Sequence, residues 1–152
     1  MASFNQTLYQ IVFSTKYRKK TLIKNRPQIF KAMRTICNKH NCVAYAVDGV
    51  EDHVHIAISI PPTVTPCVLI QRLKIESNLF IKKSGLCPTF EAWQRRYSIF
   101  TYHIDSKDRL VRYVINQERH HRKKIFKTEI EELIKIHKIK ATQKELDDFF
   151  NE

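Results

Sequence analysis

The chain has 152 residues, the size of one ordinary domain, and 43% of them are hydrophobic, which suffices for a globular core. It contains no apolar run of the roughly 18 residues that a membrane helix needs and no signal-peptide pattern at its start, so we expect an intracellular protein. Its 27 lysines and arginines against 15 acidic residues give a net charge of +12. This charge predicts a polyanionic partner, and the lack of a basic amphipathic helix favours nucleic acid over a membrane surface.

The predicted elements alternate in an order that indicates a known sheet arrangement. Strands are predicted at residues 8–14, 43–47, 52–60 and 97–104, and helices at 26–40, 65–83, 107–121, 128–137 and 142–150. The order β-α-β-β-α-β is the ferredoxin-like split arrangement, in which two helices cover one face of an antiparallel sheet and leave the other face available. We therefore expect an α+β fold in a single domain, 1–152, with a core of 1–124 and a helical C-terminal extension of 125–152.

The third predicted strand carries a pair of histidines. Side chains alternate between the two faces of a strand, so residues 54, 56, 58 and 60, all valine or isoleucine, form the core side. His53 and His55 project from the opposite face, followed there by the small Ala57 and Ser59. Two imidazoles at this spacing can chelate one divalent ion. A pair of surface histidines remains the alternative, and the strand pattern alone does not decide between them.

The helix predicted at 107–121 places Tyr113 and Gln117 one turn apart, at the flank of an apolar stripe. A tyrosine hydroxyl, with a pKa of about 10, is a poor nucleophile at neutral pH. A metal ion that polarises a phosphate would help it, and the Gln117 oxygen could bind that same ion. Taken alone, such a tyrosine is more often a packing residue and such a glutamine is more often solvated.

Two segments together resemble a known family. Residues 49–55 (GVEDHVH) and 112–121 (RYVINQERHH) resemble the corresponding motifs of the single-tyrosine HUH transposases. These are the small transposases of insertion sequences that move as single-stranded DNA, together with their repeat-associated relatives. The likeness extends from residue 8 to residue 124, and the combination of His-x-His with Tyr-x-x-x-Gln is more specific than either motif alone.

The resemblance implies a mechanism and a set of partners. His53 and His55 would bind a divalent ion, Mg²⁺ or Mn²⁺, with Gln117 as the third ligand. Tyr113 would be the nucleophile that cleaves one DNA strand, leaving a 5′-phosphotyrosine and a free 3′-hydroxyl. The partner would be single-stranded DNA with hairpin ends of a mobile element. The family further implies a homodimer with active sites shared between subunits, and a prokaryotic, cytoplasmic, nucleoid-associated protein that does not bind membranes.

Several basic side chains are candidates for contact with the DNA backbone, although a solvated surface would also explain them. Arg96 stands where the family usually has a glycine, which leaves the conformation of its loop open. The candidates are Lys16, Arg18, Lys19, Lys20, Arg95, Arg96, Arg119, Arg122, Lys123 and Lys124.

Two other functions fit the same sequence. One is a non-catalytic nucleic-acid module, because RNA-recognition domains are also ferredoxin-like sheets with basic loops. Those domains place aromatic residues on the central strands, whereas this chain has His53 and His55 there. The other is an HUH initiator of replication or plasmid transfer, but such proteins are often larger. The short chain and the Tyr-x-x-x-Gln pattern favour a transposase.

Overall fold

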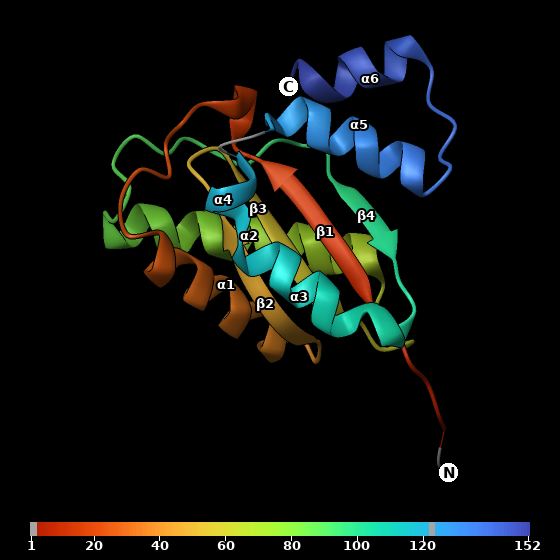
Figure 1. The fold of residues 1–152 in the computed structure, drawn as a ribbon. Coiled ribbons are helices and arrows are strands. Elements are labelled where there is room, and N and C mark those ends of the chain that lie inside the picture. Colours follow the sequence, from red (N-terminus) through yellow and green to blue (C-terminus); the bar gives the residue numbers. More distant parts are fainter. Residues whose placement is uncertain (1–2, 122–123) are drawn as a thin grey trace.

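The computed structural model describes residues 3–121 and 124–152 and is built around one antiparallel sheet (Figure 1). Its strands follow the spatial order β2-β3-β1-β4, with β1 and β3 in the centre. All three strand pairs are antiparallel. This arrangement confirms the predicted ferredoxin-like α+β class. The strands are β1 Tyr9–Ser14, β2 Val43–Gly49, β3 His53–Ser59 and β4 Ser98–Thr101.

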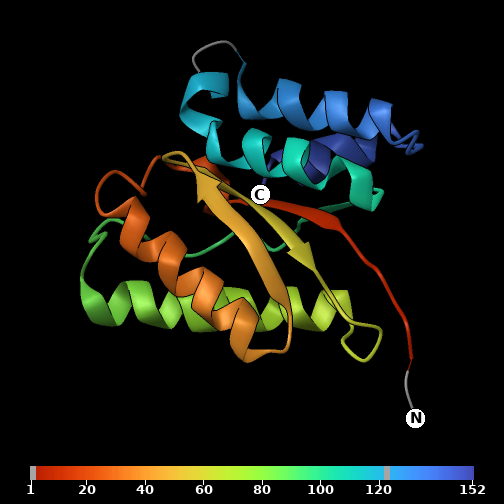
Figure 2. The ribbon, with the colours of Figure 1, turned by 60° about the horizontal axis from the view of Figure 1, so that its bottom comes forward.

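The helices cover both faces of the sheet. Figure 2 shows α1 and α2 on one side and α3, α4, α5 and α6 on the other. No helix in the described part of the chain is long and apolar enough to cross a bilayer. The helices are η1 Lys16–Arg18, α1 Arg26–Lys39, α2 Pro66–Ser84, η2 Ile104–Ser106, α3 Lys107–Ile115, α4 Gln117–His121, α5 Phe126–Ile136 and α6 Gln143–Phe150.

The main core lies between the sheet and the pair α1 and α2. The predicted apolar row of β3 is fully buried there, since Val54, Ile56 and Ile58 have no exposed surface. Met33 of α1 and Leu73 of α2 belong to the same cluster and are equally buried. The row therefore faces the core, as strand alternation predicts.

The second face of the sheet, which the sequence led us to expect open, is covered. Leu110 and Val114 of α3 pack against Ala57 of β3. Phe126 and other apolar residues of α5 pack against Val12 of β1. Both helices are amphipathic, and each buries its apolar stripe against this face. The predicted cation site therefore lies between two layers of the protein.

Most element boundaries differ from the prediction by one or two residues, and the fourth strand and the helix predicted at 107–121 differ more. Asn116 interrupts the predicted helix 107–121, which is divided into α3 and α4. The fourth strand ends at Thr101, where its pairing with Tyr9 of β1 ends. Helix α5 begins at Phe126 rather than at residue 128. A capping box precedes α6, because Thr142 and Glu145 exchange both hydrogen bonds.

Candidate metal and nucleophile site

The two histidines of β3 are enclosed by protein on every side. His53 and His55 are both 0% exposed, and their ring centroids lie 5.2 Å apart. The turn before them is tight, because the amide of Val50 donates to the carbonyl of His53 at 3.1 Å. Only glycine fits at position 49, since a Cβ atom there would lie 2.1 Å from the same carbonyl oxygen. The β2–β3 turn thus fixes where His53 begins its strand.

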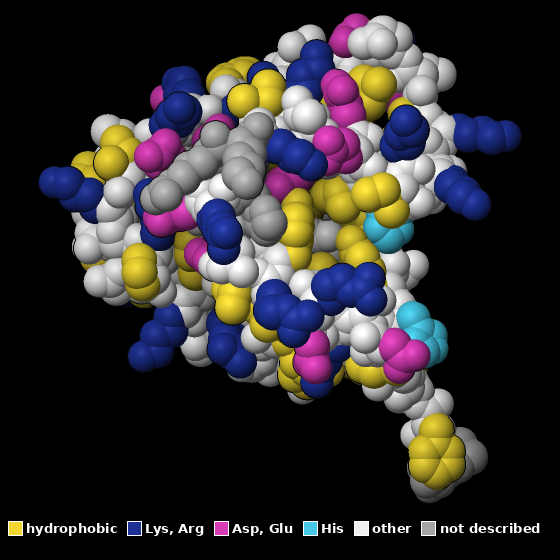
Figure 3. Space-filling model, in the orientation of Figure 1, with side chains coloured by type: hydrophobic (Ala, Val, Ile, Leu, Met, Phe, Trp, Pro, Cys, Tyr) yellow, Lys and Arg dark blue, Asp and Glu magenta, His cyan; other side chains and the backbone are white. Residues whose placement is uncertain are grey.

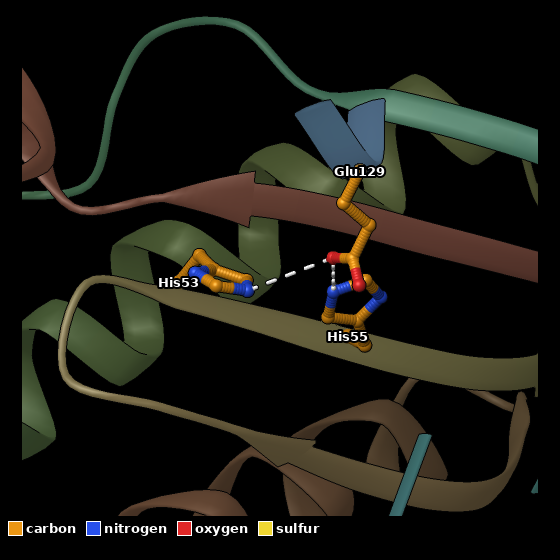
Figure 4. A group of neighbouring side chains, drawn as sticks. All are labelled: His53, His55 and Glu129. Carbon is orange, nitrogen blue, oxygen red and sulfur yellow. Dashed lines mark hydrogen bonds and ion pairs between the residues drawn. The ribbon is translucent and has the colours of Figure 1, made fainter. Parts of the chain in front are cut away.

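Neighbouring oxygens orient both imidazole rings in the same way. Nδ1 of His53 lies 2.7 Å from a carboxylate oxygen of Asp52, and Nδ1 of His55 lies 2.7 Å from Oε1 of Gln10. Both oxygens are acceptors, so each Nδ1 carries the proton and donates. Each Nε2 then turns toward Glu129 of α5 (Figure 4). This pattern, a ring held through one nitrogen while the other faces the site, is typical of metal-binding histidines.

Glu129 is the residue of the site that the sequence analysis missed. Its Oε1 lies 2.7 Å from Nε2 of His55 and 3.8 Å from Nε2 of His53. It is 3% exposed and stands on the apolar face of α5 with Phe126, Ile130 and Leu133. A signal was present in the sequence: an acidic residue within an apolar stripe must be paired or bound to a cation, because burying a lone charge is costly.

Tyr113 of α3 contacts the other oxygen of the same carboxylate. Its hydroxyl donates to Oε2 of Glu129 at 2.5 Å, and its ring meets the ring of His55 edge-on with centroids 5.7 Å apart. Burial raises the pKa of Tyr113 above its ordinary value, the charge of Glu129 and the hydrogen bond to it raise it further, and a hydrogen bond with Gln117 opposes them. The hydroxyl is therefore neutral at physiological pH. The predicted nucleophile and the two predicted imidazole ligands lie together within one protomer.

Gln117 is buried beside Tyr113 and has an unsatisfied oxygen. Its Nε2 donates to the backbone carbonyl of Tyr113 at 3.1 Å. Its Oε1 is buried and finds no hydrogen-bond partner in the described chain. An orphaned buried acceptor of this kind costs about 1–3 kcal/mol. A cation near Tyr113 would satisfy it.

These donors fit a divalent cation. One ligand atom from each of His53, His55 and Glu129 lies within 4.8 Å of the others, and all three residues are buried. Carboxylate oxygens suit both Mg²⁺ and Mn²⁺, and Mn²⁺ accepts the softer imidazole nitrogens more readily than Mg²⁺ does. The orphaned oxygen of Gln117 gives independent support, because a cation beside it would take the place of the missing hydrogen-bond donor. The donor set leaves the choice between these two ions open.

The predicted DNA-contact residues are placed in three ways. Some are already engaged: Lys19 pairs with Glu91, Arg96 with Glu152 and Lys124 with Glu132, while Arg18 donates to the carbonyl of Phe150. Arg122 and Lys123 lie outside the described residues. Figure 3 shows lysine and arginine side chains spread among acidic ones over one face. The remaining candidates are exposed and have no ion pair in the described chain; they are Lys16, Lys20, Arg95 and Arg119.

The loop that carries Arg96 is held by a half-buried lysine. Nζ of Lys74 donates to the backbone carbonyls of residues 94, 95 and 96 at 2.8, 3.2 and 2.9 Å. The same ammonium group lies 4.9 Å from the ring centroid of Phe13, a favourable position for a cation over an aromatic face. Lys74 thus orders the loop although Arg96 replaces the glycine usual in the family.

Comparison with known proteins agrees with this fold. The family model for "Transposase IS200 like" matches residues 3–117. The transposases for insertion sequence element IS200 of Salmonella typhimurium and Salmonella typhi are each 25% identical over 99 residues, 64% of this chain. The chain spans 65% of the length of these relatives.

Two solved structures share the fold. A protein of Deinococcus radiodurans, provisionally assigned as a transposase, aligns with a TM-score of 0.58 and 21% identity, over 77% of this chain and 95% of that one. A REP-associated tyrosine transposase bound to a REP hairpin aligns with a TM-score of 0.52 and 15% identity, over 75% of this chain and 70% of that one.

The four-stranded antiparallel sheet with its helices is the fold that this chain shares with both solved structures. The family model covers residues 3–117, most of the chain. The chain belongs to the family of IS200-like transposases.

Proposed function

We propose that this protein cleaves and rejoins single-stranded DNA through a covalent bond to Tyr113, with the help of a divalent ion. The observation that carries the proposal is the convergence on one carboxylate: the Tyr113 hydroxyl and the Nε2 atoms of His53 and His55 all face Glu129. A nucleophile and the ligands of an ion would thus be adjacent, and phosphoryl transfer depends on such positioning.

The chemistry needs no energy cofactor. The Tyr113 oxygen would form a bond to the phosphorus of a DNA phosphodiester while the bond from phosphorus to the 3′ oxygen breaks. The tyrosine proton would end on the departing 3′ oxygen, which leaves a 5′-phosphotyrosine and a 3′-hydroxyl. When bound, the ion would polarise the phosphate and stabilise the charge that develops on it. Attack by a 3′-hydroxyl on the phosphotyrosine reverses the step and rejoins the strand.

His53, His55 and Gln117 would hold the ion, Mg²⁺ or Mn²⁺. The orphaned Oε1 of Gln117 supports its assignment as a ligand. Asp52 and Gln10 would keep both imidazoles in the tautomer that presents Nε2.

The DNA partner would carry hairpin ends, by analogy with the REP-associated relative, which is bound to a REP hairpin. The exposed basic residues Lys16, Lys20, Arg95 and Arg119 are the first candidates for phosphate contact. Such a protein would act in the prokaryotic cytoplasm, at the nucleoid. A homodimer with shared sites stays a prediction, and the position of Tyr113 against His55 of its own protomer supports a site that one subunit can complete.

The buried state of the second sheet face argues against an RNA-recognition module. Such modules stack bases on an open sheet. Here α3 and α5 cover the face that would do so, with Leu110 and Phe126 among the residues packed on it.

The test is covalent capture on single-stranded DNA. The protein is mixed with single-stranded oligonucleotides that carry candidate hairpin ends and with Mn²⁺, and adducts are mapped by peptide mass spectrometry. We expect an adduct on Tyr113, lost in Tyr113→Phe and retained in Tyr97→Phe, with DNA affinity kept in both variants. An adduct that persists in Tyr113→Phe would overturn the proposal.

A further inference from the structure

We propose that Glu129, in the C-terminal extension, is a working part of the active site: Oε1 is a ligand of the same ion as His53 and His55, and Oε2 positions the Tyr113 hydroxyl. This inference rests on the proposed function and deepens it. Glu129 lies beyond residues 3–117, the part of the chain that the family model matches. The C-terminal extension thereby completes the site within its own protomer.

The two oxygens of Glu129 face different partners. Oε1 lies 2.7 Å from Nε2 of His55, and Oε2 accepts from the Tyr113 hydroxyl at 2.5 Å. One rigid carboxylate therefore joins the ion site to the nucleophile. If Oε1 binds the ion, the carboxylate fixes the distance between that ion and the Tyr113 hydroxyl bound to Oε2.

The atoms around Oε1 can share one cation. Nδ1 of each imidazole donates to Asp52 or Gln10, so each Nε2 of a neutral ring presents a lone pair to the site. The Glu129 carboxylate presents lone pairs as well, and such atoms repel one another when they meet in a buried site. An ion shared by both imidazoles and the carboxylate resolves this repulsion. It would also satisfy the orphaned Oε1 of Gln117.

Packing fixes Glu129 in this position. The ring of Phe126, one turn earlier on α5, lies against the ring of His53 with centroids 4.7 Å apart. Ile130 is fully buried in the cluster that includes Val12 of β1. Helix α6 adds Phe150, whose carbonyl accepts from Arg18. Glu129 is thus presented by an anchored helix rather than by a flexible tail.

The experiment compares three substitutions in the full-length chain. Glu129→Gln keeps the side-chain volume and removes the charge. Glu129→Asp keeps the charge, but its side chain is one methylene shorter, so the carboxylate lies farther from the site. Glu131→Gln, on the exposed side of the same helix, is the matched control. Thermal unfolding of each variant establishes whether it is folded. If Glu129→Gln is not folded, both readouts are taken from Glu129→Asp.

The first readout is Mn²⁺ binding without DNA, followed by electron paramagnetic resonance. We expect Glu129→Gln to bind Mn²⁺ about 10- to 100-fold more weakly than the wild type, and Glu131→Gln to bind it equally well. The second is the rate of adduct formation with Mn²⁺ and DNA both saturating. Glu129→Asp should lose about a hundredfold in that rate, because a nucleophile displaced by about 1 Å costs that much.

Two results would overturn the inference. Equal Mn²⁺ affinity in Glu129→Gln and the wild type would remove Glu129 from the ligand set. Faster adduct formation in either Glu129 variant would mean that the carboxylate obstructs the site instead of building it. If the wild type forms no adduct on any oligonucleotide while Glu129→Gln still loses Mn²⁺ affinity, the ligand role stands, and the positioning role is rejected together with the proposed function.

Discussion

Nδ1 of His55 and Oε1 of Gln10 lie 2.7 Å apart, joining the two central strands of the sheet in a buried hydrogen bond. Replacing Gln10 with leucine removes this acceptor at nearly constant volume. The ring of His55 then loses the contact that fixes its tautomer, so Mn²⁺ affinity should fall about 10- to 100-fold. Isothermal titration calorimetry of the wild type and Gln10→Leu measures it.

Tyr102→Phe is the control for this experiment. It removes only the hydroxyl to which Nε2 of Gln10 donates, at 2.7 Å, and leaves the contact with His55 intact. Tyr102→Phe should therefore lose less Mn²⁺ affinity than Gln10→Leu does. Equal affinities in all three proteins would contradict a role of Gln10 in orienting the ligand.

Gly49 and Gly85 should respond differently to alanine. At Gly49 a Cβ would lie 2.1 Å from the carbonyl oxygen of His53, so the β2–β3 turn must shift. Gly85 has a positive φ of 68° but open space around it, so Gly85→Ala should cost only about 1–2 kcal/mol in the free energy of unfolding. Urea denaturation should show a larger loss for Gly49→Ala. If Gly49→Ala loses less free energy of unfolding than Gly85→Ala, the predicted clash with the His53 carbonyl is wrong.

The sequence predicted well what depends on local periodicity. Strand alternation placed His53 and His55 opposite the apolar row of β3, and helical spacing placed Tyr113 and Gln117 one turn apart. Both predictions need only the geometry of a single element. The structure has each of these features.

What the sequence did not reveal depends on which surfaces meet. The apolar stripe in the sequence of α5 indicates that one side of this helix is buried. It does not indicate that this side packs on the sheet face that carries the histidines. The contact between Glu129 and His55, 74 residues apart, arises only from that packing. For the same reason Arg18 looked like a free basic side chain, whereas it is bonded to α6. Charge patterns do not show which lysines and arginines have protein partners.

Lys74 should make the free energy of unfolding depend on pH in the alkaline range. Burial lowers its pKa from the ordinary 10.5 to about 8, partly offset by the negative charge of Glu152. Between these two values the unfolded chain binds more protons than the folded one, so the free energy of unfolding rises with pH. The wild type should therefore gain stability relative to Lys74→Met from pH 8 to 10.5. Urea unfolding of both proteins across this range tests it, and parallel curves would refute it.

Lys20 should contribute to DNA affinity through charge alone. It is exposed and has no ion pair in the described part of the chain, whereas the adjacent Lys19 is paired with Glu91. Lys20→Ala should reduce the slope of log affinity against log salt by about 0.7 for single-stranded DNA, whatever its sequence. Lys144→Ala, an exposed lysine on α6, should leave the slope unchanged. Fluorescence anisotropy at several salt concentrations measures it, and equal slopes in Lys20→Ala and the wild type would exclude this contact.

The most direct measurement is anomalous diffraction from crystals of the wild-type protein soaked in Mn²⁺. The account predicts one strong peak within coordination distance of Nε2 of His53 and of His55, on the side that faces the Tyr113 hydroxyl. A peak elsewhere, or no peak at these imidazoles when the soak saturates other sites, would contradict a shared ion beside the nucleophile.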